Sequence, residues 1–205
     1  MEKWEYEEQC WAQGLGLVCG CDEAGAGPLA GPVYAAAVIL PRYIDIPGLN
    51  DSKQLTEKRR EALFPVIQES AEAWAVAFVD AAEIDETDIL SARMKAMQRA
   101  VDALAPRPDF ALIDGNRDKG RSAAITTPHR CIVKGDGLSA SVAAASVLAK
   151  VSRDHFMLEM AEKYPEYRFE KHKGYGTKLH YEMLDKYGPS PIHRKTFLKS
   201  WEGKG

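Results

Sequence analysis

The stretch that decides the fold is Val18-Cys19-Gly20-Cys21-Asp22-Glu23-Ala24-Gly25-Ala26-Gly27-Pro28-Leu29-Ala30-Gly31-Pro32-Val33. An apolar run ends here in two adjacent carboxylates, and a loop rich in glycine and proline follows, which cannot continue as a helix. Two such anions buried side by side would repel each other, so they need a shared cation or strongly raised proton affinities. The stretch predicts a strand that ends at an acidic rim, with metal binding as the first hypothesis.

The same stretch has two other interpretations. Gly25, Gly27 and Gly31 resemble a dinucleotide-binding loop, but that fingerprint opens a helix. Here prolines bracket the third glycine, and residues 33–40 favour extended backbone. The other interpretation is a tight turn between two strands, with both carboxylates solvated. The motif alone does not decide between the turn and the metal site.

The composition is that of an ordinary globular protein. The chain has 205 residues, of which 45% are hydrophobic and 28% charged, so we expect one domain over residues 1–205 with a small C-terminal piece. No apolar run approaches the roughly 20 residues of a membrane span, and the acidic start lacks the features of a secretory signal. The four cysteines form no C-x-x-C pair, which favours reduced, buried thiols. We therefore expect a cytoplasmic protein.

Charge is distributed unevenly along the chain. The net charge is −3, but residues 129–205 hold 14 Lys and Arg against 9 Asp and Glu, together with all five histidines. A basic C-terminal third beside an acidic remainder is typical of a polyanion-binding surface next to a carboxylate cluster. Solvated helix surfaces would produce the same pattern, so this signal is weak by itself.

Apolar runs and helical spacings alternate along the sequence. Five strands are predicted, at residues 17–21, 33–40, 74–79, 110–113 and 131–133. Three helices are predicted: one after an N-cap at Thr56, one opened by Thr87 or Asp88 and stopped by Pro106, and one from Ser141 to Tyr164. Small residues at 143–146 imply a close approach to a neighbouring backbone, and residues from 188 onward are expected to be irregular. The fold class is α/β, a mixed five-stranded sheet flanked by helices.

Two further strands are followed by an acid and glycine. Asp114 comes directly after residues 110–113, and Asp136 lies in a glycine-flanked turn after residues 131–133. If the strand ends meet, four carboxylates gather without Cys or His, and all-oxygen ligation selects Mg²⁺ or Mn²⁺ over zinc. Two such ions can promote hydrolysis of a phosphodiester. The alternative for either aspartate is that it stabilises a turn or caps a helix and binds no metal.

Together these residues resemble bacterial ribonuclease HII. The resemblance spans about residues 15–200 and rests on motifs in the family's order: Asp22-Glu23-Ala24-Gly25, Pro28 to Val33, Asp51-Ser52-Lys53, Ile113-Asp114-Gly115, Lys134-Gly135-Asp136, Ser141 to Asp154, and His172 to Thr177. It implies a ribonuclease H-like fold in which residues from about 165 to 205 form a small C-terminal extension, helical and irregular, that binds substrate. It also implies an endonuclease that cuts RNA/DNA hybrids and single ribonucleotides embedded in duplex DNA.

The resemblance assigns roles to residues of this chain. Asp22, Glu23, Asp114 and Asp136 would be the catalytic carboxylates that hold two Mg²⁺ or Mn²⁺ ions. Cleavage is expected 5′ to a ribonucleotide, leaving a 3′-hydroxyl and a 5′-phosphate. Asp154 lies inside a predicted helix, where we expect a structural pairing with its neighbour Arg153 or a backbone group, and it stays outside the metal set.

The resemblance also implies a set of substrate contacts. Lys53, with Ser52 in the same motif, would lie near the substrate phosphates, and Tyr175 would pack on the sugar at the RNA-to-DNA junction. Basic residues would contact duplex phosphates, Lys173 and Arg194 first, together with Lys171, His172, Lys178, His193 and Lys195. Neither His172 nor His180 is required as a general acid. The alternative is that these are ordinary surface or core side chains that do not contact a substrate.

One position departs from the family pattern. Gly25-Ala26-Gly27 stands where the family has Gly-Arg-Gly, a loop that reads the ribose 2′-hydroxyl largely through backbone groups. Replacing Arg by Ala keeps the backbone freedom of the glycines but removes a charge beside the phosphates. We expect weaker substrate binding or cutting, with metal binding intact.

Other function classes remain open from sequence. A non-enzymatic nucleic-acid-binding module would explain the basic third but not four acids at strand ends. A magnesium-dependent phosphatase or sugar kinase would use similar acids but would not need Tyr175. A type 1 ribonuclease H or a junction-resolving nuclease is the nearest enzyme alternative. We expect a monomer with no obligate protein partner and no membrane association.

Overall fold

The computed structural model describes residues 3–202, apart from the side chains of residues 200 and 202. Residues 1–2 and 203–205, which the predicted domain includes, lie outside the described residues. The strands are β1 (Val18–Ala24), β2 (Val33–Ile39), β3 (Ala73–Val79), β4 (Phe110–Asp114) and β5 (His129–Ile132). The α-helices are α1 (Glu5–Ala12), α2 (Glu57–Ser70), α3 (Ala81–Glu86), α4 (Ile89–Asp102), α5 (Gly135–Leu138), α6 (Ala140–Lys163), α7 (Phe169–His172), α8 (Lys178–Tyr187) and α9 (Lys195–Glu202), and two 3-10 helices are η1 (Ser52–Gln54) and η2 (Pro165–Tyr167).

The five strands form one mixed sheet in the order β3-β2-β1-β4-β5. β2 pairs antiparallel with both β1 and β3, whereas β4 pairs parallel with β1 and β5. The predicted fold class is confirmed, and all five predicted strands are present. β1 extends three residues further than the sequence suggested, through Ala24, because both carboxylates take part in the pairing with β2. The loop after β1 leads into β2 and not into a helix, so the dinucleotide-binding interpretation is wrong.

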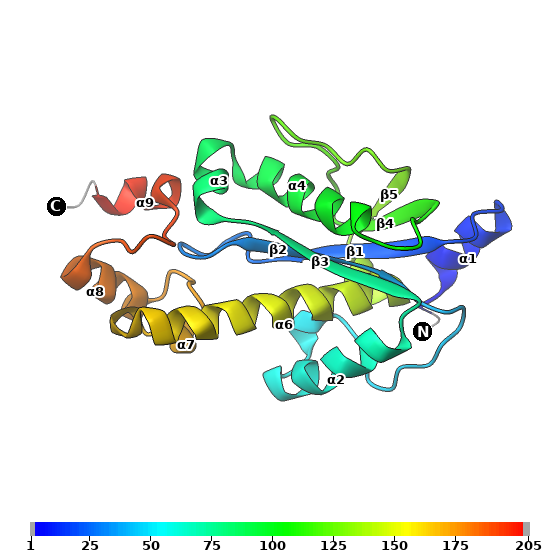
Figure 1. Ribbon diagram of the computed structural model, residues 1–205, viewed down its shortest axis with the longest axis horizontal. Coiled ribbons are helices and arrows are strands. Elements are labelled where there is room, and N and C mark those ends of the chain that lie inside the picture. Colours follow the sequence, from blue (N-terminus) through cyan, green and yellow to red (C-terminus); the bar gives the residue numbers. More distant parts are fainter. Residues whose placement is uncertain (1–2, 203–205) are drawn as a thin grey trace.

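Helices cover both faces of the sheet (Figure 1). Side chains alternate between the two faces along a strand. Cys19 and Cys21 of β1 therefore pack in the cluster that includes α4, while the backbone of Gly20 meets α6 on the other face. A Cβ at Gly20 would lie 2.2 Å from the backbone nitrogen of Val142, so only glycine permits this approach. The close packing predicted from the small residues 143–146 is seen against β2, where Ala144 and Ala145 share a buried cluster with Ala36 and Val38.

The start of α6 differs from the prediction by two residues. Ser139, not Ser141, is the N-cap, and its hydroxyl oxygen accepts a hydrogen bond from the backbone nitrogen of Val142. The carboxylate of Glu7 accepts from the hydroxyl of Ser139 and the backbone nitrogen of Ser141. A buried acid from α1 thus fixes the N-terminus of the long helix, a contact across more than 130 residues that sequence spacing does not reveal.

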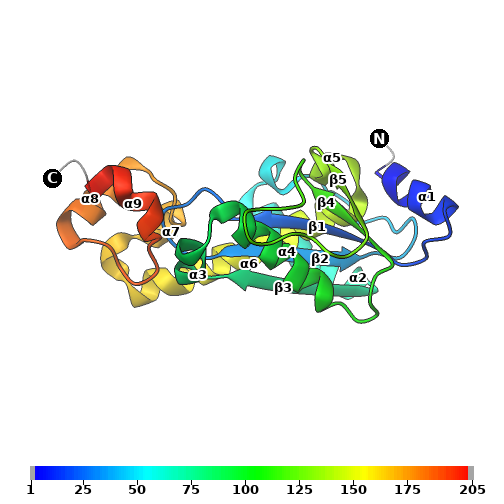
Figure 2. The same cartoon turned by 90° about the horizontal axis from the view of Figure 1, so that it is seen from above.

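The C-terminal helices pack beyond one end of the sheet, against the second half of α6 (Figure 2). Their core includes Met157, Phe169, Leu184 and Leu198, together with Leu29 from the loop after β1. The predicted irregular tail is partly wrong: residues 188–194 are irregular, but α9 follows, because Asp85 accepts hydrogen bonds from the first two backbone nitrogens of that helix. The tail packs back onto the domain, where Leu198 joins the buried cluster of Leu29 and Met157.

None of the helices within residues 3–202 is both long and apolar enough to cross a membrane. The cysteines are free thiols; Cys10, Cys19 and Cys21 are buried and Cys131 is half-buried.

Candidate active site

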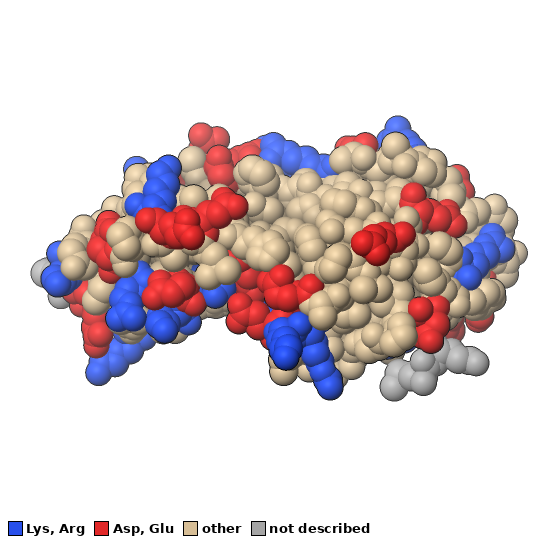
Figure 3. Space-filling model, turned by 60° about the horizontal axis from the view of Figure 1, so that its bottom comes forward, with Lys and Arg blue, Asp and Glu red and all other residues tan. Residues whose placement is uncertain are grey.

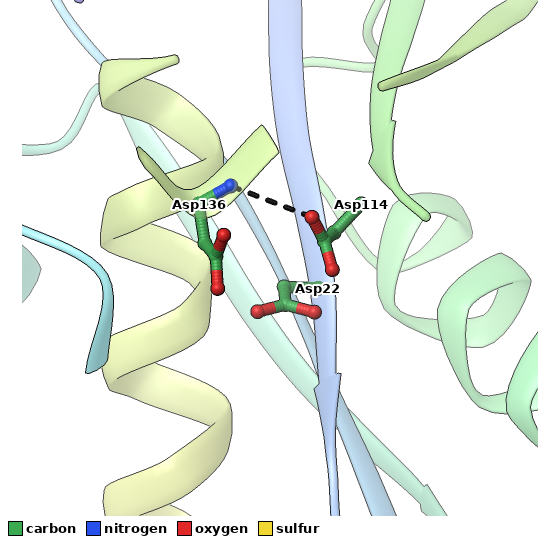
Figure 4. A group of neighbouring side chains, drawn as sticks. All are labelled: Asp22, Asp114 and Asp136. Atoms are coloured by element: carbon green, nitrogen blue, oxygen red, sulfur yellow. Dashed lines mark hydrogen bonds between the residues drawn. The ribbon is translucent and has the colours of Figure 1, made fainter. Parts of the chain in front are cut away.

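Three carboxylates from separate parts of the chain meet on the α6 side of the sheet. Asp22 comes from β1, Asp114 from the last position of β4, and Asp136 from α5 (Figure 4). One oxygen from each lies within 4.8 Å of an oxygen of the other two. Asp22 and Asp136 are buried and Asp114 is half-buried. The parallel pairing of β1 with β4 places these strand ends at the same edge, as the sequence analysis expected.

Asp114 also positions Asp136. Its Oδ1 accepts hydrogen bonds from the backbone nitrogens of Gly135 at 2.7 Å and of Asp136 at 3.4 Å, and so it caps the short helix α5. Lys134, directly before that helix, adopts left-handed backbone, with φ of 58°. The capping alternative for Asp114 is therefore correct for one oxygen, while the other oxygen stays available to the cluster. One residue performs both tasks.

Glu23 lies apart from the three aspartates. Because successive residues of a strand point to opposite faces, Glu23 is directed toward α4, where its Oε1 lies 2.6 Å from Nη2 of Arg93. Its Oε2 is buried and has no hydrogen-bond partner among the described residues. Buried carboxylate oxygens are rarely left without a partner. Glu23 thus lies beside the cluster but outside the group of three aspartates. Its Oε2 has no hydrogen-bond partner within the described part of the chain.

The electrostatics of the cluster call for a cation. Burial raises the pKa of Asp22 well above its ordinary value, and the charges of Glu23 and Asp114 raise it further. Burial likewise raises the pKa of Asp114 and of Asp136. Lys53 Nζ lies 3.1 Å from Asp136 Oδ2; burial disfavours its charge, but the hydrogen bond and charge of Asp136 outweigh burial and raise its pKa. One ammonium does not balance these acids, and an all-oxygen donor set fits Mg²⁺ or Mn²⁺.

Asp22→Asn is expected to stabilise the metal-free protein at neutral pH. Because the folded pKa of Asp22 lies above its ordinary value of 3.8, the folded state binds more protons, and the free energy of unfolding falls as pH rises from about 4 through the raised pKa. At pH 7 the variant should unfold about 2–8 °C higher, equivalent to about 1–2 kcal/mol. Thermal unfolding in EDTA at pH 4 and pH 7 measures this. An Asn variant that melts below the wild type at pH 7 would contradict it.

The predicted recognition residues lie on two adjoining loops. Residues 25–27 begin the loop after β1, and Tyr175 stands between α7 and α8 with its side chain 43% exposed. The backbone nitrogen of Leu29 donates a 2.8 Å hydrogen bond to the carbonyl of Gly174, which ties the loops together. Residues almost 150 positions apart in sequence thus form one surface.

Several predicted phosphate contacts are wrong for this structure. Arg194, His172 and His193 are buried, and each guanidinium nitrogen of Arg194 donates to a backbone carbonyl, so these side chains cannot reach a duplex. The half-buried Lys173 donates to the carbonyl of Glu170. Among the predicted phosphate contacts, the exposed side chains are those of Lys171, Lys178 and Lys195.

Two other predicted polar roles also change. Ser52 is buried and its hydroxyl accepts a 2.6 Å hydrogen bond from Ser146, which fastens η1 to α6 and leaves only Lys53 directed at the cluster. Asp154 pairs with Lys150, one helical turn away, at 2.6 Å and with Arg60 at 3.8 Å. The expected partner Arg153 is wrong because successive residues of a helix do not face each other.

Charge on the surface is mixed where the sequence suggested a basic region. Figure 3 shows Lys and Arg side chains interleaved with Asp and Glu at the end of the molecule that holds α8. Basic side chains of the C-terminal third therefore do not form an unbroken patch on this face.

Comparison with known proteins identifies the family. The sequence model for "Ribonuclease HII" matches residues 19–201. The chain belongs to the ribonuclease HII family. Among curated relatives, ribonuclease HII of Idiomarina loihiensis is 55% identical over 181 residues, covering 88% of this chain and 95% of that protein. Ribonuclease HII of a Geobacillus species is 52% identical over 192 residues, covering 94% of this chain and 68% of that protein.

Solved structures agree with this assignment. The crystal structure of ribonuclease H2 from Pyrococcus horikoshii superposes with a TM-score of 0.75 at 27% identity, covering 92% of this chain and 98% of that one. The ribonuclease HII chain described here is therefore a metal-dependent endoribonuclease with a ribonuclease H-like fold, and its family acts on RNA/DNA hybrids.

Sequence reasoning missed two arginines beside this site, one half-buried and one fully buried. Arg93 pairs with Glu23, and Arg153 lies fully buried beneath Tyr175. A signal for the second was present, because Arg153 lies four residues after Ala149 and four before Met157, on the apolar stripe of its helix. Position on that stripe predicts burial even for a charged side chain.

Proposed function

We propose that this ribonuclease HII hydrolyses the phosphodiester on the 5′ side of a ribonucleotide, including a single ribonucleotide embedded in duplex DNA. The products would be a 3′-hydroxyl and a 5′-phosphate. The observation that carries the proposal is the convergence of Asp22, Asp114 and Asp136, with ligand atoms within 4.8 Å and proton affinities raised by burial and mutual repulsion. Such a cluster is unfavourable unless cations share it.

Asp22, Asp114 and Asp136, with Glu23 beside them, would hold two Mg²⁺ or Mn²⁺ ions. Bound there, divalent ions lower the pKa of an attacking water and stabilise the attacking and leaving oxygens. Lys53 would place its ammonium, already 3.1 Å from Asp136, against the charge that develops on the phosphate. The exposed side chain of Lys53, 73% accessible, suits contact with a substrate that arrives from solvent.

Recognition would come from the two adjoining loops. We propose that the backbone of residues 25–27 contacts the ribose 2′-hydroxyl and that the exposed ring of Tyr175 packs on the neighbouring sugar. The hydrogen bond from Leu29 to Gly174 supports a joint role, because it sets the spacing between loop and ring. Residues from about 165 onward would thus form the substrate-binding extension.

Cleavage of three matched duplexes tests the proposed function. One duplex carries a single ribonucleotide, one is an RNA/DNA hybrid, and one is entirely DNA; each is incubated with Mg²⁺, Mn²⁺ or EDTA. The expected result is metal-dependent cutting on the 5′ side of the lone ribonucleotide and no cutting of DNA. Cutting of the long hybrid alone would favour type 1-like specificity, and cutting of branched DNA junctions would favour a resolvase.

Ala26→Arg is expected to strengthen substrate binding. Ala26 is half-buried and its carbonyl accepts from Arg194, so a longer side chain can extend without changing the backbone contact. One added phosphate contact should raise kcat/KM about three- to tenfold through KM and steepen the dependence of log affinity on log salt by about 0.9. Steady-state kinetics and salt titration measure both effects. Unchanged turnover and an unchanged salt slope would show that position 26 does not contact phosphate.

A further inference from the structure

Two arginines in the substrate-binding half of the molecule are completely buried. Arg153 on α6 and Arg194 before α9 both have 0% exposed surface. Neither has a carboxylate within 4.0 Å among the side chains that the structure describes. Buried charges are normally paired with an opposite charge, so these two need another source of stabilisation.

All three guanidinium nitrogens of Arg194 donate to the loop that follows β1. Its Nε donates to the carbonyl of Gly31 at 2.9 Å, Nη1 to Ala26 at 2.9 Å and Nη2 to Gly25 at 2.6 Å. The position of Arg194 is in turn fixed, because its backbone nitrogen donates to the carbonyl of Leu29. One guanidinium therefore holds both ends of the segment from residue 25 to residue 31.

Arg153 approaches the same loop from the other side. Its Nε donates to the carbonyl of Pro32 at 3.1 Å and its Nη2 to that of Ala30 at 3.1 Å, while Nη1 donates to Lys173 at 3.0 Å. Its guanidinium carbon lies 5.7 Å from the centre of the Tyr175 ring. Arg153 thus joins the loop after β1 to the loop that carries the tyrosine.

The two arginines direct the polar groups of the loop. Gly25 has φ of 91°, and a Cβ there would lie 2.0 Å from Nε of Arg153, so the backbone is pressed directly onto a guanidinium. The carbonyls of Gly25 and Ala26 are used by Arg194, whereas within residues 3–202 no backbone hydrogen bond is donated by the amides of residues 25–27. The amides remain available to an oxygen of a ligand.

We propose that Arg194 is a positioning residue that determines discrimination between ribonucleotide and deoxyribonucleotide, by holding the amides of residues 25–27 toward the 2′-hydroxyl. This inference rests on the proposed function. A planar guanidinium presents several donors in a fixed fork, and the single ammonium of lysine cannot span three carbonyls in this way. Arg194→Lys therefore keeps the charge but releases the loop.

Binding of two duplexes in the Asp22→Asn background tests this role. The duplexes are identical except for one ribonucleotide, and fluorescence anisotropy gives their affinity ratio with Mg²⁺ present. We expect Arg194→Lys to reduce the ratio at least tenfold, mainly by weakening the ribonucleotide duplex. Arg107→Lys, at a side chain that is 78% exposed and distant in sequence from both loops, is the matched control and should leave the ratio unchanged.

The readout separates positioning from loss of structure. Partial unfolding removes active protein equally for both duplexes and leaves their ratio unchanged, so a folded Arg194→Lys variant with the parent's ratio overturns the proposal. A Lys variant without a cooperative thermal transition also overturns it, because Arg194 would then serve the whole fold. If wild type cuts no ribonucleotide duplex and the parent shows no discrimination, the proposed function itself has failed, and this inference with it.

Discussion

Asp22→Asn should lower kcat on a duplex with one ribonucleotide by about 10³-fold, a loss of about 4 kcal/mol in transition-state stabilisation. Asp22 is 2% exposed, and it shares close oxygen contacts with both other aspartates. Asparagine has nearly the same shape but one neutral oxygen and an amide donor. It therefore removes a charge and a ligand atom without leaving a cavity.

The comparison needs a stability measurement and a matched control. Asp22→Asn should be at least as stable as wild type without metal, so lost activity cannot be attributed to unfolding. Asp45→Asn changes an exposed aspartate outside the site and should retain wild-type kcat. If Asp22→Asn cleaved within tenfold of wild type, the carboxylate cluster would not be the reaction centre.

Tyr175→Ala should lower kcat/KM on the same duplex by about 10- to 100-fold, the range for losing one stacking contact. The backbone of Tyr175 is held independently of the ring: its nitrogen donates to the carbonyl of His172 at 2.9 Å, and its carbonyl accepts from His180 Nδ1 at 2.9 Å. Alanine therefore removes the ring and leaves the loop in place. Tyr175→Phe keeps the ring and should retain most of the activity.

Tyr187→Ala is the matched control for this effect. The Tyr187 side chain is 46% exposed, close to the 43% of Tyr175, but it lies at the end of α8 against Tyr167. Cleavage kinetics of both alanine variants, with thermal unfolding of each, measure the difference. Equal losses in the two variants would assign the effect to general destabilisation of the C-terminal helices and not to substrate contact.

Local sequence signals predicted much of the architecture. Apolar runs located all five strands, and caps at Thr56 and Asp88 located two helices, because strands and helix starts depend on residues next to each other in the chain. Six shorter helices within residues 3–202 were missed: α1, α3, α5, α7, α8 and α9. The start of α9 depends on a distant contact with Asp85 that neighbouring residues do not encode.

Local sequence signals also predicted part of the candidate site. An acid at the end of each apolar run marked Asp22, Asp114 and Asp136, and parallel pairing brought them together. The adjacency of Asp22 and Glu23 suggested joint ligation. Strand alternation directs Glu23 toward Arg93 on α4, beside the three aspartates, and leaves its Oε2 without a hydrogen-bond partner within residues 3–202, so joint ligation stays a proposal.

By itself the sequence determined the fold class and the acidic strand ends, because these follow from short-range patterns of apolar and acidic residues. Only the tertiary structure decided which polar side chains face a substrate and which are buried. Arg194 shows the difference: its place among basic residues suggested a phosphate contact, yet its guanidinium is enclosed by carbonyls some 163 to 169 positions away. Arg194 lies in the irregular segment before α9, where no helical stripe indicates burial, so its exposure depends on which other segments fold over it.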